Sequence, residues 1–125
     1  MRTVIAVGVA GFFGSIARYG VEGFVSARSD TSFPWGTFAV NISGCLIMGV
    51  LFAMLIEGRV IVVPWLRTAV TVGLLGAYTT FSTFTLETFR LVEDGSYVAA
   101  LGNSIGSLAI GLVALYVGVL VGRLI

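Results

Sequence analysis

The chain has 125 residues, of which 58% are hydrophobic and only 10% are charged, and its formal net charge is +1. This number of charged side chains is too small to cover the surface of a soluble domain of this size. We therefore expect the protein to lie in a lipid bilayer. The near-neutral charge gives no reason to expect a nucleic-acid partner. The absence of histidine and the single cysteine, Cys45, exclude a disulfide framework and a zinc site. No paired carboxylates share an apolar segment and no phosphate-binding loop occurs, so nothing indicates an enzyme.

Four apolar segments are long enough to cross a bilayer as helices, which takes about 20 residues. In chain order they cover approximately residues 4–26, 35–56, 65–89 and 97–124, with short polar stretches between them. The first begins like a signal peptide but continues past Arg18 without a convincing cleavage site, so we interpret it as a span. The sequence therefore predicts an all-α membrane protein with one four-helix domain over residues 1–125.

The first segment ends with two charged residues that lie one helical turn apart. Arg18 and Glu22 are spaced i, i+4 and can form an ion pair. Arg18 either anchors the segment or attracts anions at a vestibule. Glycines recur in the first and fourth segments, where small residues let membrane helices approach closely. We expect a packing role for these glycines: Gly8, Gly11, Gly14, Gly102, Gly106, Gly111 and Gly118.

The second segment carries an amide, Asn41, in the middle of an apolar run. Such a group is costly in lipid unless it is hydrogen-bonded. Thr37 lies one turn earlier on the same helix face. Two interpretations remain open: either these polar groups hold neighbouring helices together, or Asn41 lines a path and donates an N–H to what passes along it.

The third segment contains a polar stretch at its midpoint, residues 76–85, with a glycine, five serine or threonine residues and two phenylalanines. Polar or broken backbone at that depth is tolerated only where it faces protein or a water-filled path. One interpretation is a helix broken mid-membrane near Gly76 and Thr79, with free backbone carbonyls that suit a hard cation such as sodium. The other is a continuous helix in which the threonine hydroxyls bond to carbonyls one turn earlier.

Phe81 and Phe84 are spaced i, i+3 and therefore share one helix face. Core packing is the ordinary role of such rings, but here hydroxyl residues, among them Ser82 and Thr83, flank them. Because the edge of an aromatic ring is weakly positive, ring edges beside hydroxyl donors can stabilise a small anion without holding it too tightly. Glu87, one turn beyond Thr83, either reaches the membrane interface or bonds to a neighbouring span.

The fourth segment is the least informative of the four. Ser104 and Ser107 share a helix face at i, i+3. They either extend a track of hydroxyl groups or serve only as polar contacts between helices.

The seven basic residues, all arginines, show almost no bias between the two sides that four spans define. Orientation requires an excess of positive charge on one side, so this chain can insert in both directions. Opposite copies could then pair as an antiparallel homodimer; a single topology with weak bias is the alternative. One side holds Arg2, Arg59, Arg67 and Arg123, and the other holds Arg18, Arg28 and Arg90.

Three sequence segments resemble the signature segments of the CrcB/Fluc fluoride channels. They are residues 11–19 (GFFGSIARY), 34–44 (PWGTFAVNISG) and 76–84 (GAYTTFSTF), of which the third is the most specific. The resemblance extends over the whole chain in length and span count. It implies a dual-topology antiparallel homodimer in a bacterial inner membrane, with two antiparallel pathways for passive export of fluoride.

The resemblance also implies roles for individual residues. Phe81 and Phe84 match the paired phenylalanines of the pathway, and Asn41 matches its asparagine. Thr37 matches a hydroxyl along the pathway and Glu87 a carboxylate near the rings.

Two further positions, Gly76 and Thr79, match residues whose backbone carbonyls hold a central structural sodium ion. The alignment leaves open whether Ser104 or Ser107 lines the pathway. Ala77 and Tyr78, which lie between Gly76 and Thr79, are expected to vary.

Two other classes of protein fit parts of this sequence pattern. A proton-coupled exporter of the small multidrug resistance type also has four spans and about this length. It needs a membrane-buried carboxylate in the middle of the first span, where residues 7–14 have none; Glu22 lies near the end. A membrane subunit without transport activity would leave the amide, the polar stretch and the hydroxyl cluster unexplained.

Overall fold

A computed structural model gives the fold and describes residues 1–58 and 60–125. Arg59, one of the arginines in the topology argument, lies outside the described residues. Within them the chain is helical and has no strands. The elements are α1 (Arg2–Ser26), α2 (Trp35–Leu51), η1 (Phe52–Ile56), α3 (Pro64–Thr68), η2 (Ala69–Leu75), α4 (Gly76–Tyr78), α5 (Phe81–Glu93) and α6 (Tyr97–Leu124), where η1 and η2 are π-helical turns.

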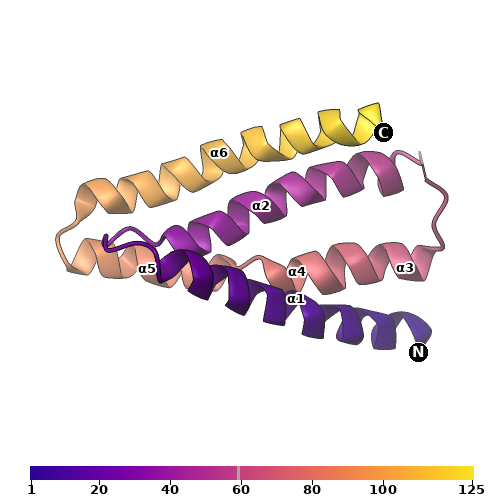
Figure 1. Ribbon diagram of the computed structural model, residues 1–125, viewed down its shortest axis with the longest axis horizontal. Coiled ribbons are helices and arrows are strands. Elements are labelled where there is room, and N and C mark those ends of the chain that lie inside the picture. Colours follow the sequence, from indigo (N-terminus) through magenta and orange to yellow (C-terminus); the bar gives the residue numbers. More distant parts are fainter. Residues whose placement is uncertain (59) are drawn as a thin grey trace.

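Four helical segments are long and apolar enough to cross a membrane, which confirms the predicted all-α architecture with four membrane-length helices. Both chain termini lie at one end of the molecule, beside the connection between η1 and α3 (Figure 1). The α1–α2 and α5–α6 connections lie at the opposite end. An even number of crossings requires this arrangement. The four segments are Arg2–Ser26, Trp35–Ile56, Pro64–Glu93 and Tyr97–Leu124.

The third segment continues beyond its expected end near residue 89, because α5 runs to Glu93. The polar residues after position 89 suggested a loop, but Leu91 is buried against the bundle and keeps this turn helical. Gly95 then ends the helix with a positive φ of 73°, a backbone conformation that glycine adopts without strain.

The helices pack in two main pairs, α2 with α6 and α1 with η2. Gly118 of α6 lies so close to α2 that an added Cβ would clash with the Leu46 carbonyl. Gly14 of α1 likewise lies against the Leu74 carbonyl. The expectation of close packing was wrong for Gly8 and Gly106, where an added Cβ would meet open space. Gly8 is exposed and Gly106 is partly exposed.

The buried apolar core is small for a chain of this length. Its central cluster consists of Val40, Leu75 and Tyr78, with Met48 and Leu51 packed against it. Many large apolar side chains are exposed on all four segments. Such a surface suits contact with lipid or with another protein chain rather than with water.

Candidate functional site

Two extended residues separate α4 from α5 within the third segment. The backbone of Thr79 has ψ 159° and that of Thr80 has φ −147°, and helix resumes at Phe81. The Thr79 hydroxyl donates to the Leu75 carbonyl at 3.0 Å, which is the bond one turn back that a continuous helix would also allow. Thr79 therefore combines the hydroxyl bond of one interpretation with the extended backbone of the other.

Asn41 of α2 binds the extended pair through both ends of its amide. Its Nδ2 donates to the Thr80 carbonyl at 3.0 Å, and its Oδ1 accepts from the Thr80 N–H at 2.9 Å. Thr80 in turn caps α5, because its Oγ1 accepts from the Thr83 N–H at 3.3 Å. In a continuous helix those two N–H groups would bond to the carbonyls of Gly76 and Thr79. Both carbonyls therefore lack the donor that the helix would supply.

Two further residues of α2 hold the same region. Ser43 Oγ donates to the Val40 carbonyl at 3.1 Å, so the Tyr78 hydroxyl, 2.8 Å away, is the donor in the bond between Ser43 and Tyr78. Gly44 lies directly against the Thr79 methyl group, leaving no room for a side chain. The stretch 41–44 of α2 thus forms a seat for residues 78–80, and we call it the α2 seat.

Beside the α2 seat lies an open groove of about 430 Å³, the polar groove. It brings together many of the candidates from the sequence, including Asn41 and both phenylalanines. The rings of Phe81 and Phe84 are tilted by 39° with centroids 5.8 Å apart, and Phe81 is 79% exposed. The groove is lined by Asn41, Cys45, Thr79, Thr80, Phe81, Phe84, Ser104, Ser107 and Leu108.

The hydrogen bonds already formed decide which groups of the polar groove can donate to a ligand. The Ser104 hydroxyl donates to the Ala100 carbonyl of its own helix at 2.8 Å. The Ser107 hydroxyl makes only a long contact of 3.4 Å, to Asn103 Oδ1. Asn41 uses one amide hydrogen on Thr80 and keeps the second without a partner among the described residues. Asn41 and Ser107 are therefore the donors most available to a ligand.

Thr37 and Glu87 lie outside the polar groove and bond to each other. Thr37 is 1% exposed, and its hydroxyl donates to Glu87 Oε1 at 2.8 Å. The other carboxylate oxygen, Oε2, is buried and has no hydrogen-bond partner among the described residues. Thr37 lies one turn from Asn41 along α2, and Glu87 lies one turn from Thr83 along α5. The pair therefore adjoins the groove without lining it.

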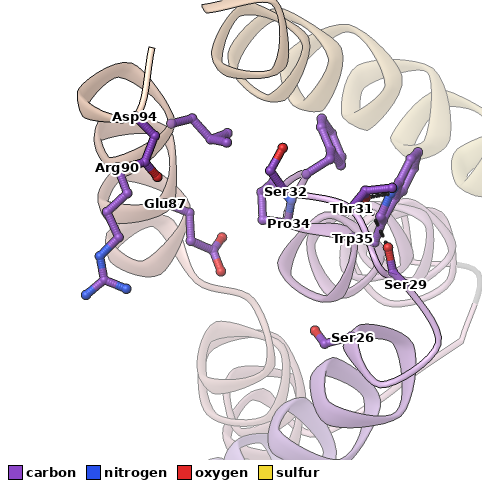
Figure 2. A pocket seen from close by; sticks show the side chains of 11 residues that line it. Ser26, Ser29, Thr31, Ser32, Pro34, Trp35, Glu87, Arg90 and Asp94 are labelled. Carbon is purple, nitrogen blue, oxygen red and sulfur yellow. Dashed lines mark hydrogen bonds between the residues drawn. The ribbon is translucent and has the colours of Figure 1, made fainter. Parts of the chain in front are cut away.

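Glu87 instead lines a second pocket, of about 370 Å³, near the α1–α2 connection. In Figure 2, Glu87 points across this pocket toward Ser32 and Pro34, whereas Arg90 points away from them. Asp94 also lines it, together with hydroxyl residues that follow α1. We call this pocket the vestibule; it shares no lining residue with the polar groove.

The remaining candidates are more peripheral. Ser82 is exposed, and Thr83 is half-buried and accepts from the Thr80 hydroxyl at 3.0 Å. Arg18 and Glu22 form no ion pair: within residues 1–58 and 60–125 the only ion pair joins Arg123 and Glu57. The i, i+4 spacing permits a pair without enforcing one, because two partly exposed charges gain little from pairing.

One buried polar residue was missed in the sequence. Asn103 of α6 is 0% exposed, and its Nδ2 donates to Thr88 Oγ1 at 2.9 Å. It carries the same signal as Asn41, an amide inside an apolar segment, and that signal could have identified it.

Comparison with known proteins identifies close relatives. Residues 5–119 match the family described as CrcB-like protein, Camphor Resistance (CrcB). A protein of Nitratidesulfovibrio vulgaris is 42% identical over 125 residues, which is the whole of both chains. One of Magnetococcus marinus is 45% identical over 119 residues, or 95% of this chain and 96% of the relative, and one of Trichormus variabilis is 40% identical over 124 residues, or 99% and 90%. Each relative is named a fluoride-specific ion channel FluC.

Proposed function

We infer that this chain, which belongs to the CrcB family, is a passive channel for fluoride. It is a multi-pass membrane protein, and its relatives are named as ion channels and not as enzymes. One observation carries the proposal: the polar groove joins an amide donor, Asn41, to the exposed rings of Phe81 and Phe84. The channel would export cytoplasmic fluoride across a cell inner membrane and relieve its toxicity.

Fluoride is small and strongly hydrated, so a selective pore has to replace its water shell with donors. The free amide hydrogen of Asn41 and the loosely held Ser107 hydroxyl can do so, and the edges of the two rings add weak positive potential. The polar groove contains no ionised side chain among its lining residues. Each contact is therefore weak enough for the anion to leave again.

The outer parts of the path are assigned by position. The vestibule, with Glu87 fixed by Thr37, would connect the polar groove to solution. Ser82 and Thr83 would add hydroxyl groups beside the rings. Arg18 stays a predicted source of positive potential for arriving anions.

We also propose an antiparallel homodimer of dual topology. The second amide hydrogen of Asn41 has no partner among the described residues and is unfavourable against lipid, so a second copy is the natural cover for the open groove. The balanced arginines allow both orientations in one membrane. In that dimer the interrupted third segments would meet in the middle of the membrane.

A structural sodium ion, not itself transported, fits between the two copies. The carbonyls of Gly76 and Thr79 lack their helical donors, and two copies would offer four such oxygens. Gly76 is exposed, so a second copy can approach this part of the third segment. Neutral carbonyl oxygens are ligands that a hard cation accepts. The ion would hold the two interrupted segments together.

Efflux from liposomes tests the proposed function. Purified protein is reconstituted in liposomes loaded with fluoride or chloride, and an ion-selective electrode follows efflux after a potassium ionophore is added. We expect fast fluoride efflux, negligible chloride efflux, and a large loss of fluoride efflux in Phe81→Ile. Phe89→Ile is the matched control, because Phe89 is an exposed ring of the same helix that lines neither the polar groove nor the vestibule.

Absence of fluoride efflux from well-folded native protein would overturn the proposal. Proton-driven exchange of a cationic compound, as in the small multidrug resistance proteins, would then be tested with Glu22 as the first residue to replace. An equal loss of fluoride efflux in Phe81→Ile and Phe89→Ile would show that fluoride does not pass along the helix face that carries Phe81.

A further inference from the structure

A chain of hydrogen bonds runs behind the polar groove from α6 to α5. The Ser107 hydroxyl donates to Asn103 Oδ1 at 3.4 Å, and Asn103 Nδ2 donates to Thr88 Oγ1 at 2.9 Å. The Thr88 hydroxyl then donates to the Phe84 carbonyl at 2.8 Å. Asn103 is 0% exposed and does not line the groove. Ser107 and Phe84, the first and last residues of this series of hydrogen bonds, both line it.

The bond between Thr88 and the Phe84 carbonyl determines the direction of the other bonds in this series of hydrogen bonds. Because the only hydroxyl hydrogen of Thr88 goes to the Phe84 carbonyl, Thr88 Oγ1 can only accept from Asn103. The amide must therefore turn Nδ2 toward Thr88, which leaves Oδ1 toward Ser107. Asn103 thus presents an acceptor, and not a donor, to the Ser107 hydroxyl.

We propose that Asn103 is a positioning residue that keeps the anion site at Ser107 shallow, an inference that rests on the proposed fluoride conduction. Its Oδ1 holds the Ser107 hydrogen while the groove is empty. An anion that enters the groove competes with Oδ1 for that same hydrogen. The competition weakens binding and speeds release, so Asn103 favours rapid passage over tight binding without touching the anion.

This arrangement distinguishes Ser107 from Ser104. The Ser104 hydrogen is held by a backbone carbonyl of its own helix at 2.8 Å, and Asn103 plays no part in that bond. A substitution at Asn103 should therefore act through Ser107 and leave any contribution of Ser104 unchanged.

A double-mutant cycle between Asn103→Leu and Ser107→Ala tests the proposal, with fluoride efflux measured over a range of fluoride concentrations. In the native background, Asn103→Leu should lower both the maximal rate and the half-saturating fluoride concentration, by at least about fivefold in the rate. In the Ser107→Ala background the same substitution should change both by less than about twofold. The matched cycle with Ser104→Ala should be additive.

Equal effects of Asn103→Leu in the native and Ser107→Ala backgrounds would overturn the proposal, since a residue that only stabilises the fold acts regardless of Ser107. If Asn103→Leu does not fold, Thr88→Val replaces it. That variant removes the acceptor that orients the amide, and its effect should likewise disappear in Ser107→Ala. Failure of the proposed function is a distinct result, because the native protein itself would then show no fluoride efflux.

Discussion

Helix α2 makes two close contacts that work by different means. Toward its C-terminal end, glycines let its backbone touch the backbone of α6, as at Gly49 and Gly118. In its middle, the α2 seat holds residues 78–80 mainly through the hydrogen bonds of Asn41 and Ser43. Continuous helices satisfy their own backbone groups and need only close approach, whereas the extended residues need partners from a neighbour. The amide of Asn41 is therefore placed where the facing backbone is not helical.

The largest effect is expected where backbone meets backbone. Gly118→Val places branched carbons against the Leu46 carbonyl and the Gly49 Cα, neither of which can move without bending α2. Such overpacking costs about 3 kcal/mol or more, and we expect no folded protein by size-exclusion chromatography in detergent. Gly106→Val is the matched control, because an added Cβ at that position of α6 meets open space. A folded Gly118→Val protein would show that the two helices can separate.

The next largest effect should follow loss of the amide in the α2 seat. Asn41→Leu keeps the approximate volume but leaves the Thr80 N–H without a partner, at about 1–3 kcal/mol, and removes one donor from the Thr80 carbonyl. We expect a clear fall in thermal stability in detergent and loss of most fluoride efflux. Ile47→Leu, at an exposed position of the same helix, is the control. Unchanged stability in Asn41→Leu would mean that the extended residues do not depend on α2.

A smaller effect is expected at the glycine of the α2 seat. Gly44→Ala pushes a methyl group into the Thr79 side chain, which must rotate and lose its bond to the Leu75 carbonyl. The cost is about 1–3 kcal/mol, and fluoride efflux should fall because the carbonyls around Thr79 shift. The second substitution Thr79→Ser removes the clashing methyl group and keeps the hydroxyl. The double variant should therefore recover stability and fluoride efflux. If neither recovers, the Thr79 methyl group is not the cause of the defect in Gly44→Ala.

The smallest effect should come from Tyr78→Phe, which removes one hydroxyl group from the α2 seat. The lost bond to Ser43 is worth about 0.5–1.5 kcal/mol, so a modest fall in thermal stability with little change in fluoride efflux is expected. Tyr97→Phe is the control, since Tyr97 is exposed and its hydroxyl has no hydrogen-bond partner in the described part of the chain. Equal stability of the two variants would show that the Tyr78 bond contributes nothing.

Much of the fold could be predicted because bilayer thickness sets the length of an apolar helix. The two π-helical turns, η1 and η2, could not, since their apolar residues fit an α-helix equally well. The continuation of α5 to Glu93 depends on the burial of Leu91, a tertiary contact that the polar composition after residue 89 does not reveal.

The site was predictable as a set of residue types but not as a network. Asn41, Phe81 and Phe84 stand out from the sequence, and the structure brings them to one groove. Which hydrogens are still free depends on bonds between distant segments. The contrast between Ser104, held by its own helix, and Ser107, held loosely by Asn103, appears only once those bonds are known.

The two extended residues also change the electrostatics of the third segment. They divide it, so α5 starts at Phe81 with an N-terminus of its own, far from both ends of Pro64–Glu93. A helix N-terminus carries about half an elementary positive charge, because its aligned peptide dipoles end in N–H groups without helical partners. Thr80 caps the N–H of Thr83 without adding an opposite charge. The chain thereby gains a fixed positive potential next to its exposed phenylalanine without an ionised side chain.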